Sequence, residues 1–139
     1  MGVAFGYTPA RLGESEVLRP CLAVFVGFEG RVAPAVSMMV DTGSDACIID
    51  TAVAHMAGFD PSRVGKKTLI EGLTKAQDAY LVPVQILVRD LKREVNAEIY
   101  FTQLRGIAGI LGHGGFLEEF SVTFVKGRYF EFNDVDENV

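Results

Sequence analysis

The chain has 139 residues, of which 49% are hydrophobic, and a formal net charge of -5, so we expect one globular domain over residues 1–139 that needs no disulfide or metal staples. This acidic balance excludes a nucleic-acid partner, because binding to phosphates requires clustered Lys and Arg, and the sequence has no such cluster. The apolar runs are too short for a membrane partner and the N-terminus lacks a signal pattern, so we expect a cytoplasmic protein.

The N-terminal third is predicted to contain an arm followed by strands. Residues 1–20 show no clean periodicity, so we expect a loosely held arm. Residues 22–28 and 32–40 are rich in β-formers and flank a Glu-Gly-Arg turn, which is typical of a hairpin. Residues 46–49 form a second apolar run after a polar turn. They predict a buried strand.

A short helix is predicted over residues 52–57. Asp50 or Thr51 can cap its first turn, and Gly58 is typical of a helix end. The next segment, residues 61–67, is expected to be a polar connector.

Two further strands are predicted at residues 69–70 and 80–88, on either side of a mostly polar tip. Pro83 favours an edge or a bulge, because proline has no N–H for a central ladder. Residues 95–101 follow a charged turn and are also strand-like.

The C-terminal third predicts a strand over residues 106–112 and a short helix over 116–120. Residues 122–125 and 128–132 flank a Lys-Gly pair and predict a closing hairpin. The chain is therefore expected to be nearly all β, with two brief helices.

The candidate for chemistry is the turn Val40-Asp41-Thr42-Gly43-Ser44-Asp45 between two apolar runs. Asp41 supplies a carboxylate, Gly43 lets the backbone turn beneath it, and the Thr42 and Ser44 hydroxyls can fix the loop by local hydrogen bonds. An alternative is an Asx-type turn without catalysis.

This turn, the later Ile110-Leu111-Gly112 and the segments 115–117 and 122–124 resemble the retropepsin-like aspartic proteases. The resemblance spans most of the chain from residue 22 to residue 132. It implies an all-β fold: a closed β-barrel of retropepsin (acid protease) type with one or two short helices. It further implies that two copies of this subunit pair around a two-fold axis to form a homodimer.

The count of active-site motifs supports a dimer independently. The sequence holds one Asp-Thr-Gly, whereas a two-carboxylate mechanism needs two, and Asp50-Thr51-Ala52 lacks the glycine. A homodimer supplies the second Asp41 by symmetry. Two close carboxylates share a proton, so one can activate water while the other stabilises the oxyanion. The expected activity is that of an aspartic endopeptidase on a peptide or protein substrate, with no cofactor and no metal.

The resemblance also implies roles for neighbouring residues. Thr42 would brace the two active loops across the dimer axis, Gly43 would contact the substrate backbone, and Asp45 would hold substrate or the dimer.

The resemblance further implies a flap over residues 70–79, whose tip residues Gly72, Leu73 and Thr74 would contact substrate. An ordinary surface hairpin is the alternative for this segment. Retroviral relatives have an Arg after the glycine that matches Gly112, whereas this chain has His113, so any brace must be made differently here.

Other functions compete with the protease. A retropepsin-fold dimer that binds or assembles peptides without cutting them is the main alternative, and a purely structural barrel is the weaker one. A Ser/His/Asp hydrolase using Ser44 is disfavoured, because no nucleophile elbow surrounds it. His55 and His113 are expected on a helix face or a turn, and Cys47 in the core.

Overall fold

The computed structural model describes residues 2–70 and 77–133. Most of them lie in strands. In chain order the elements are β1 (Val3–Gly6), β2 (Thr8–Leu12), β3 (Ser15–Arg19), β4 (Cys21–Phe28), β5 (Arg31–Val32), β6 (Val36–Val40), β7 (Ile48–Asp50), α1 (Thr51–Met56), α2 (Pro61–Val64), β8 (Lys66–Ile70), β9 (Gln77–Val88), β10 (Glu94–Thr102), β11 (Gly109–Leu111), the 3-10 turn η1 (Leu117–Glu119), β12 (Ser121–Val125) and β13 (Tyr129–Asn133).

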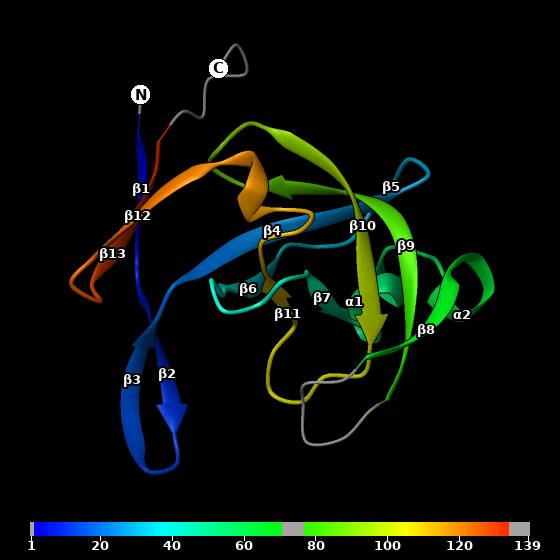
Figure 1. The fold of residues 1–139 in the computed structure, drawn as a ribbon, viewed down its shortest axis with the longest axis horizontal. Coiled ribbons are helices and arrows are strands. Elements are labelled where there is room, and N and C mark those ends of the chain that lie inside the picture. Colours follow the sequence, from blue (N-terminus) through cyan, green and yellow to red (C-terminus); the bar gives the residue numbers. More distant parts are fainter. Residues whose placement is uncertain (1, 71–76, 134–139) are drawn as a thin grey trace.

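The largest sheet closes into a barrel (Figure 1). Its strands follow the order β4-β6-β11-β7-β10-β9, and β9 pairs back with β4 from Val24↔Val88 to Gly27↔Gln85. β5 and β8 extend the sheet at its two ends. Closure removes most of the open strand edges, which would otherwise expose unpaired N–H and C=O groups. The predicted closed β-barrel with short helices is confirmed.

The long strand β9 shows why these residues form strands. Val82, Val84, Ile86 and Val88 alternate along it and all are buried, so one face of the strand lies in the core. Pro83 pairs with β10 on one side. On its other side the β8 ladder ends at Leu81 and the β4 ladder starts at Gln85, so the proline lies opposite a gap between two ladders.

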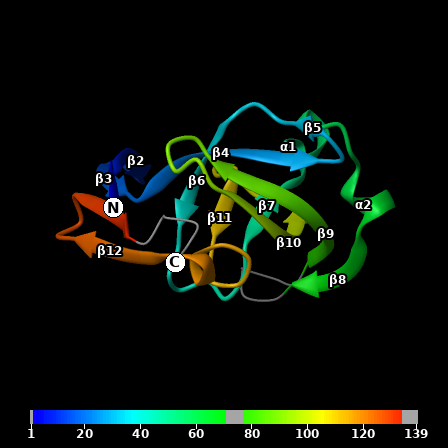
Figure 2. The same ribbon diagram turned by 90° about the horizontal axis from the view of Figure 1, so that it is seen from above.

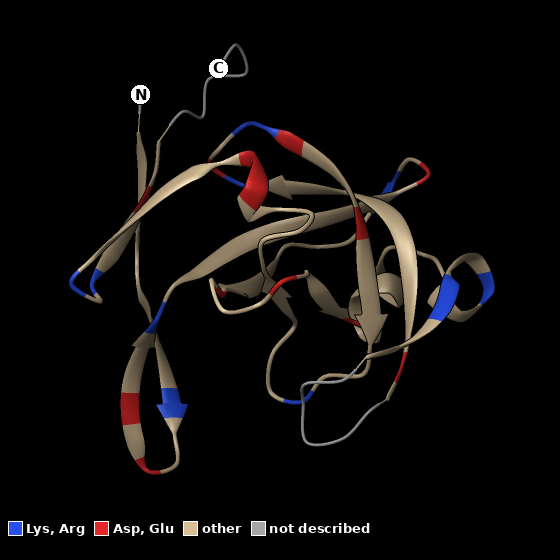
Figure 3. Ribbon diagram, viewed as in Figure 1, with Lys and Arg blue, Asp and Glu red and all other residues tan. Residues whose placement is uncertain are grey.

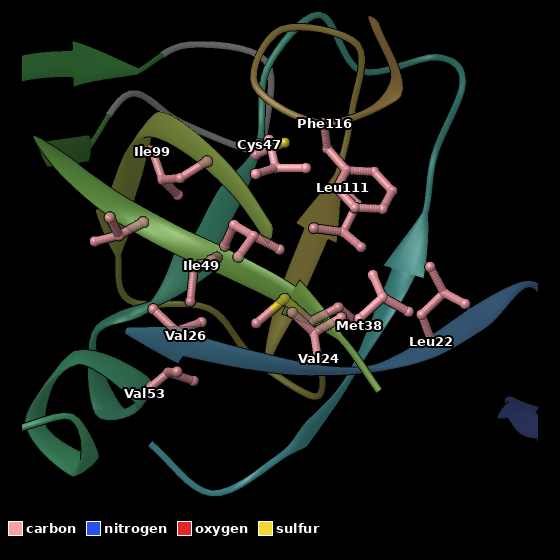
Figure 4. Packing of buried hydrophobic residues seen from close by; sticks show 14 of the residues in the cluster. Leu22, Val24, Val26, Met38, Cys47, Ile49, Val53, Ile99, Leu111 and Phe116 are labelled. Carbon is pink, nitrogen blue, oxygen red and sulfur yellow. The ribbon is translucent and has the colours of Figure 1, made fainter. Parts of the chain in front are cut away.

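The hydrophobic core fills the barrel (Figure 4). Side chains from β4, β6, β7, β10, β11 and α1 meet there, and each fully buried Val, Leu or Ile contributes roughly 1.5–3 kcal/mol relative to exposure. Phe116 lies beside Leu111 in this cluster, as Figure 4 shows. It also packs edge-on against Phe132 at 6.0 Å between ring centroids. These contacts join the barrel to a second sheet.

That second sheet has the order β1-β13-β12 and is built from the two ends of the chain. Val3 pairs with Phe132 and Phe5 with Phe130, and the rings of Phe5 and Phe130 stack at 5.6 Å. The predicted closing hairpin is confirmed as β12–β13. The prediction of a loose arm over residues 1–20 is wrong, because β1 joins this sheet and β2 and β3 form a hairpin. Figure 2 shows the β1-β13-β12 sheet and the β2–β3 hairpin at one side of the barrel.

The helices are short. Asp50 caps α1 as predicted, with its Oδ2 accepting from the Ala52 N–H at 3.3 Å, and Gly58 follows the helix with a φ of 86°. The expected connector at residues 61–67 contains α2, capped by Asp60 with a proline in its first turn. The predicted 116–120 helix is the shorter η1, and the 106–112 strand shortens to β11. Across residues 2–70 and 77–133, no helix has the length and apolarity to cross a membrane.

Candidate active site

Asp41 follows the last residue of β6. Its N–H donates to the Leu111 carbonyl at 3.0 Å, which extends the parallel β6–β11 ladder by one residue. The side chain is half-buried, and its Oδ1 accepts from the Gly43 N–H at 2.9 Å. The Ser44 N–H donates to the Asp41 carbonyl at 3.2 Å. The backbone of the turn therefore orients the carboxylate.

Gly43 and Ser44 shape this turn. A Cβ on Gly43 would lie 3.2 Å from Asp41 Oδ1, so any side chain there would crowd the carboxylate. The Ser44 hydroxyl donates to the Ala46 carbonyl at 2.7 Å. Its proton is thus engaged by backbone, which argues against Ser44 as the nucleophile of a Ser/His/Asp hydrolase. Thr42 and Asp45 are exposed on the same turn.

A second loop after β11 is bound to the Asp41 turn through backbone. The His113 N–H donates to the Ser44 carbonyl at 3.0 Å, and the Gly114 N–H donates to the Asp45 carbonyl at 2.8 Å. Gly112 has no room for a side chain, because a Cβ would overlap the carbonyl oxygens of Ser44 and Ala46. The two glycine-bearing segments that the sequence singled out therefore come together in one site.

A side chain joins the same two loops. His113 Nε2 lies 2.8 Å from the Thr42 carbonyl oxygen. A carbonyl oxygen only accepts, so Nε2 carries the proton in this bond. The sequence predicted a turn histidine and a brace made differently from that of retroviral relatives, but it did not connect the two. The position of His113 directly after Gly112 was the only sequence feature that could have indicated this contact.

A pocket of about 410 Å³ opens beside Asp41. It is bounded by the segments on either side of the β2–β3 hairpin, by the end of β6 and by the C-terminal hairpin. The lining residues are Tyr7, Pro20, Met39, Val40, Asp41, Thr42 and Phe124. Tyr7, Pro20 and Phe124 are separated from Asp41 by long stretches of sequence, so sequence reasoning missed them. Segments near the two ends of the chain thus form part of the pocket wall.

The strands of the candidate flap lie on another side of the site. β8 and β9 pair antiparallel up to Ile70↔Gln77, as a hairpin requires. Residues of β8 share a pocket of about 240 Å³ with Ala46 and Ile48, which follow the Asp41 turn. The predicted contact residues Gly72, Leu73 and Thr74 lie outside the described residues.

A polar network fixes the start of β9. Thr102, a buried polar residue of β10, donates from Oγ1 to the Asp78 carbonyl at 2.7 Å. Gln77 Nε2 donates to Thr102 Oγ1 and to the Gln103 carbonyl, each at 3.0 Å. The base of the candidate flap is therefore held to β10 by side chains as well as by strand pairing.

Cys47 lies close to the Asp41 turn but is buried, as the sequence predicted. Burial raises the pKa of its thiol to about 11; a backbone hydrogen bond with Gly112 partly offsets this rise, and the charge on Glu118 adds to it. A neutral thiol is a poor nucleophile. In the part of the chain that the structure describes, no three His, Cys, Asp or Glu side chains are grouped so as to hold a metal ion.

The sequence matches the family model described as aspartyl protease over residues 26–113, which includes the Asp41 turn, the candidate flap and the loop at Gly112. The chain belongs to the aspartyl protease family. None of the curated proteins matches it significantly.

Two solved structures place this member of the aspartyl protease family among the retropepsin-like folds. A retropepsin-like aspartic protease from Rickettsia conorii matches with a TM-score of 0.67 and 18% identity, over 96% of this chain and 92% of the other. EIAV protease, solved with the inhibitor HBY-793, matches with a TM-score of 0.52 and 20% identity, over 75% of this chain and 88% of the other. The shared feature is the fold.

Proposed function

We propose that this chain is an aspartic endopeptidase that works as a homodimer, with one Asp41 from each subunit. The observation that carries the proposal is the Asp41 turn, in which the Gly43 N–H orients a half-buried carboxylate at the rim of a pocket. Membership of the aspartyl protease family supports the same chemistry. The sequence contains one Asp-Thr-Gly, so a second copy of the chain is the natural source of the second carboxylate.

The proposed mechanism uses the two carboxylates as a pair. At close range they hold one proton between them, because ionising both would be costly. The ionised carboxylate takes a proton from a water molecule, which attacks the carbonyl carbon of the peptide bond. The protonated carboxylate hydrogen-bonds to the developing oxyanion. The first carboxylate then passes the proton it took from water to the leaving nitrogen, the C–N bond breaks and the carbonyl group re-forms.

We assign supporting roles to the neighbours of Asp41. Thr42 braces the two turns across the two-fold axis, and its exposed position suits contact with a partner. Gly43 leaves room for substrate backbone beside the carboxylate, and Asp45 holds substrate or the partner subunit. The flap tip, with Gly72, Leu73 and Thr74, covers the bound peptide. A cytoplasmic location stays a prediction.

The decisive experiment is cleavage of a peptide library by the wild-type protein and by Asp41→Asn. The variant removes one charge at the pair and is nearly isosteric, so it is expected to fold and dimerise but to lose activity. Asp90→Asn is the matched control, because Asp90 is exposed in the β9–β10 turn. We expect wild type and control to cleave equally.

Two other results would redirect the assignment. Equal cleavage by wild type and Asp41→Asn would reject Asp41 as the catalytic carboxylate. No cleavage by any variant, with peptide binding retained in a titration, would favour a non-catalytic dimer that binds or assembles peptides.

A further inference from the structure

The hairpin formed by β2 and β3 has no other sheet to pair with in the described residues. Its register runs from Thr8↔Arg19 to Leu12↔Ser15, and it forms a two-stranded sheet of its own. Figure 1 shows it projecting away from the barrel. An isolated two-stranded hairpin is only marginally stable in water, and both of its outer edges are open. Such a hairpin is expected to gain stability from a partner surface.

The hairpin side chains suit a protein surface as partner. Leu12 is 63% exposed and Leu18 is 50% exposed, and the alternation of strand side chains puts them on opposite faces. Figure 3 shows acidic and basic residues together on the hairpin, so it presents no uniform field for a charged polymer. Burying Leu12 and Leu18 against another protein would remove exposed apolar surface from water, which is favourable.

The root of the hairpin is fixed beside Asp41. Tyr7 and Pro20 immediately flank the hairpin, and both line the Asp41 pocket. The Val40 N–H donates to the Pro20 carbonyl at 2.8 Å, and the Tyr7 N–H donates to the Arg128 carbonyl at 2.8 Å. Five residues of strand extend roughly 17 Å. The hairpin therefore starts at the rim of the candidate active site and reaches well beyond it.

The pairing of the β1-β13-β12 sheet bears on which element can contact a second copy of the chain. β13 already pairs with β1 on one edge and with β12 on the other, all within one subunit. Both edges of β13 are therefore used within the subunit. The β2–β3 hairpin, which pairs with no other strand of the described residues, is free to contact a second copy near the pocket rim.

We infer that the Thr8–Arg19 hairpin is an arm that docks on a second copy of this chain, beside that copy's Asp41 turn. This inference rests on the proposed function, which brings a second Asp41 to the pocket rim. A copy that binds there lies close to the hairpin, because Tyr7 and Pro20 at the hairpin root line the pocket. By two-fold symmetry each subunit docks its own hairpin on the other. The dimer therefore buries two copies of Leu12 and two copies of Leu18.

The test compares wild type, the double variant Leu12→Ser with Leu18→Ser, and Val32→Ser in sedimentation across a concentration series. Val32 in β5 is 62% exposed and lies outside the Asp41 pocket, so it controls for loss of an exposed apolar side chain. We expect the double variant to raise the dimer dissociation constant at least about tenfold, and Val32→Ser to leave it unchanged. Equal dissociation constants for all three, or a wild type that stays monomeric, would overturn the inference.

Hydrogen exchange gives a test that needs no variant. Backbone amides of residues 8–19 should gain protection as the wild-type dimer fraction rises, whereas amides of β5 should not change. Dimerisation without protection of residues 8–19 would refute the arm. Failure of the proposed function is distinguishable, because a dimer weakened by the double variant but inactive on peptides keeps the arm and rejects the protease. If instead the dimer cleaves peptides and its dissociation constant is unchanged by the double variant, the protease assignment stands and the arm is rejected.

Discussion

His113 donates a hydrogen bond from Nε2 to the Thr42 carbonyl oxygen at 2.8 Å. The backbone of the same loop donates to Ser44 and Asp45, so three residues of the Asp41 turn are each held by the loop after Gly112. Thr42 is directly bonded to Asp41 in the chain. The histidine is therefore in a position to fix the carboxylate through the backbone without touching it.

Replacing His113 tests this positioning role. His113→Ala removes the bond to Thr42 and is expected to lower the free energy of unfolding by about 1 kcal/mol. It is also expected to lower kcat/KM for peptide cleavage by roughly tenfold to a hundredfold, because small shifts of a catalytic group are expensive. His113→Gln, whose amide can still donate, should restore part of both quantities. Urea titration and peptide kinetics measure them, and equal loss in Gln and Ala variants would contradict the hydrogen-bond explanation.

Gly112 is expected to tolerate no side chain. In Gly112→Ala the new methyl group meets the carbonyl oxygens of Ser44 and Ala46, which are backbone atoms and cannot rotate away. We expect a loss of roughly 3 kcal/mol in the free energy of unfolding. Gly6→Ala is the control, since a Cβ added there would have no atom within 4 Å, and it should change stability by less than about 0.5 kcal/mol. Similar urea midpoints for both variants would argue against tight contact between the loops.

Thr102 is expected to control the base of the candidate flap. Thr102→Val keeps the shape but removes the hydroxyl bond to the Asp78 carbonyl and one of the two bonds of the Gln77 amide, at a cost of about 1–3 kcal/mol. Thr102→Ser keeps the hydroxyl and should behave like wild type. Amide exchange along β8 and β9 is the sensitive measurement, with faster exchange expected only in the valine variant. Unchanged exchange in both variants would show that strand pairing alone holds this base.

Cys47 should give stability a pH dependence at alkaline pH. The pKa of its thiol rises from an ordinary 9.0 to about 11 in the folded protein, mainly through burial. The unfolded chain therefore releases the proton first, so the contribution is present below pH 9 and is lost as pH rises through about 11. It amounts to about 2–3 kcal/mol.

The measurement is the difference in unfolding free energy between wild type and Cys47→Ala from pH 8 to pH 11. This difference should shrink as pH rises, since other titrating groups are common to both proteins. A constant difference would mean that the thiol of Cys47 is not protected by burial.

Local patterns were sufficient to predict the Asp41 turn, the α1 cap and most barrel strands. Each depends on residues adjacent in sequence: Asp50 caps the next turn, and the alternation of Val82 to Val88 needs only one buried face. The pairing of β9 with β4 and the meeting of Gly112 with Ser44 depend on distant segments. The sequence could name these partners only through resemblance to a family.

The N-terminal region shows where local patterns fail. β1 has four residues, and its partner β13 lies at the other end of the chain, so its two half-buried side chains, Val3 and Phe5, carry too short an alternation to recognise. The β2–β3 hairpin lacks a buried face within the subunit and thus shows no amphipathic signal. The contribution of Tyr7 and Pro20 to the Asp41 pocket follows from these two elements and was missed with them.

The pairing of Val3 with Phe132 also has a consequence for synthesis on the ribosome. β1 pairs with β13, which is translated much later, and at 5–20 residues per second the interval between the two strands is roughly 6–26 s. During that interval Phe5 has no ring to stack on, although barrel strands such as β4 and β6 already have each other. The apolar side chains of β1 therefore stay exposed until β13 has been translated, and a translational pause before β13 would prolong that exposure.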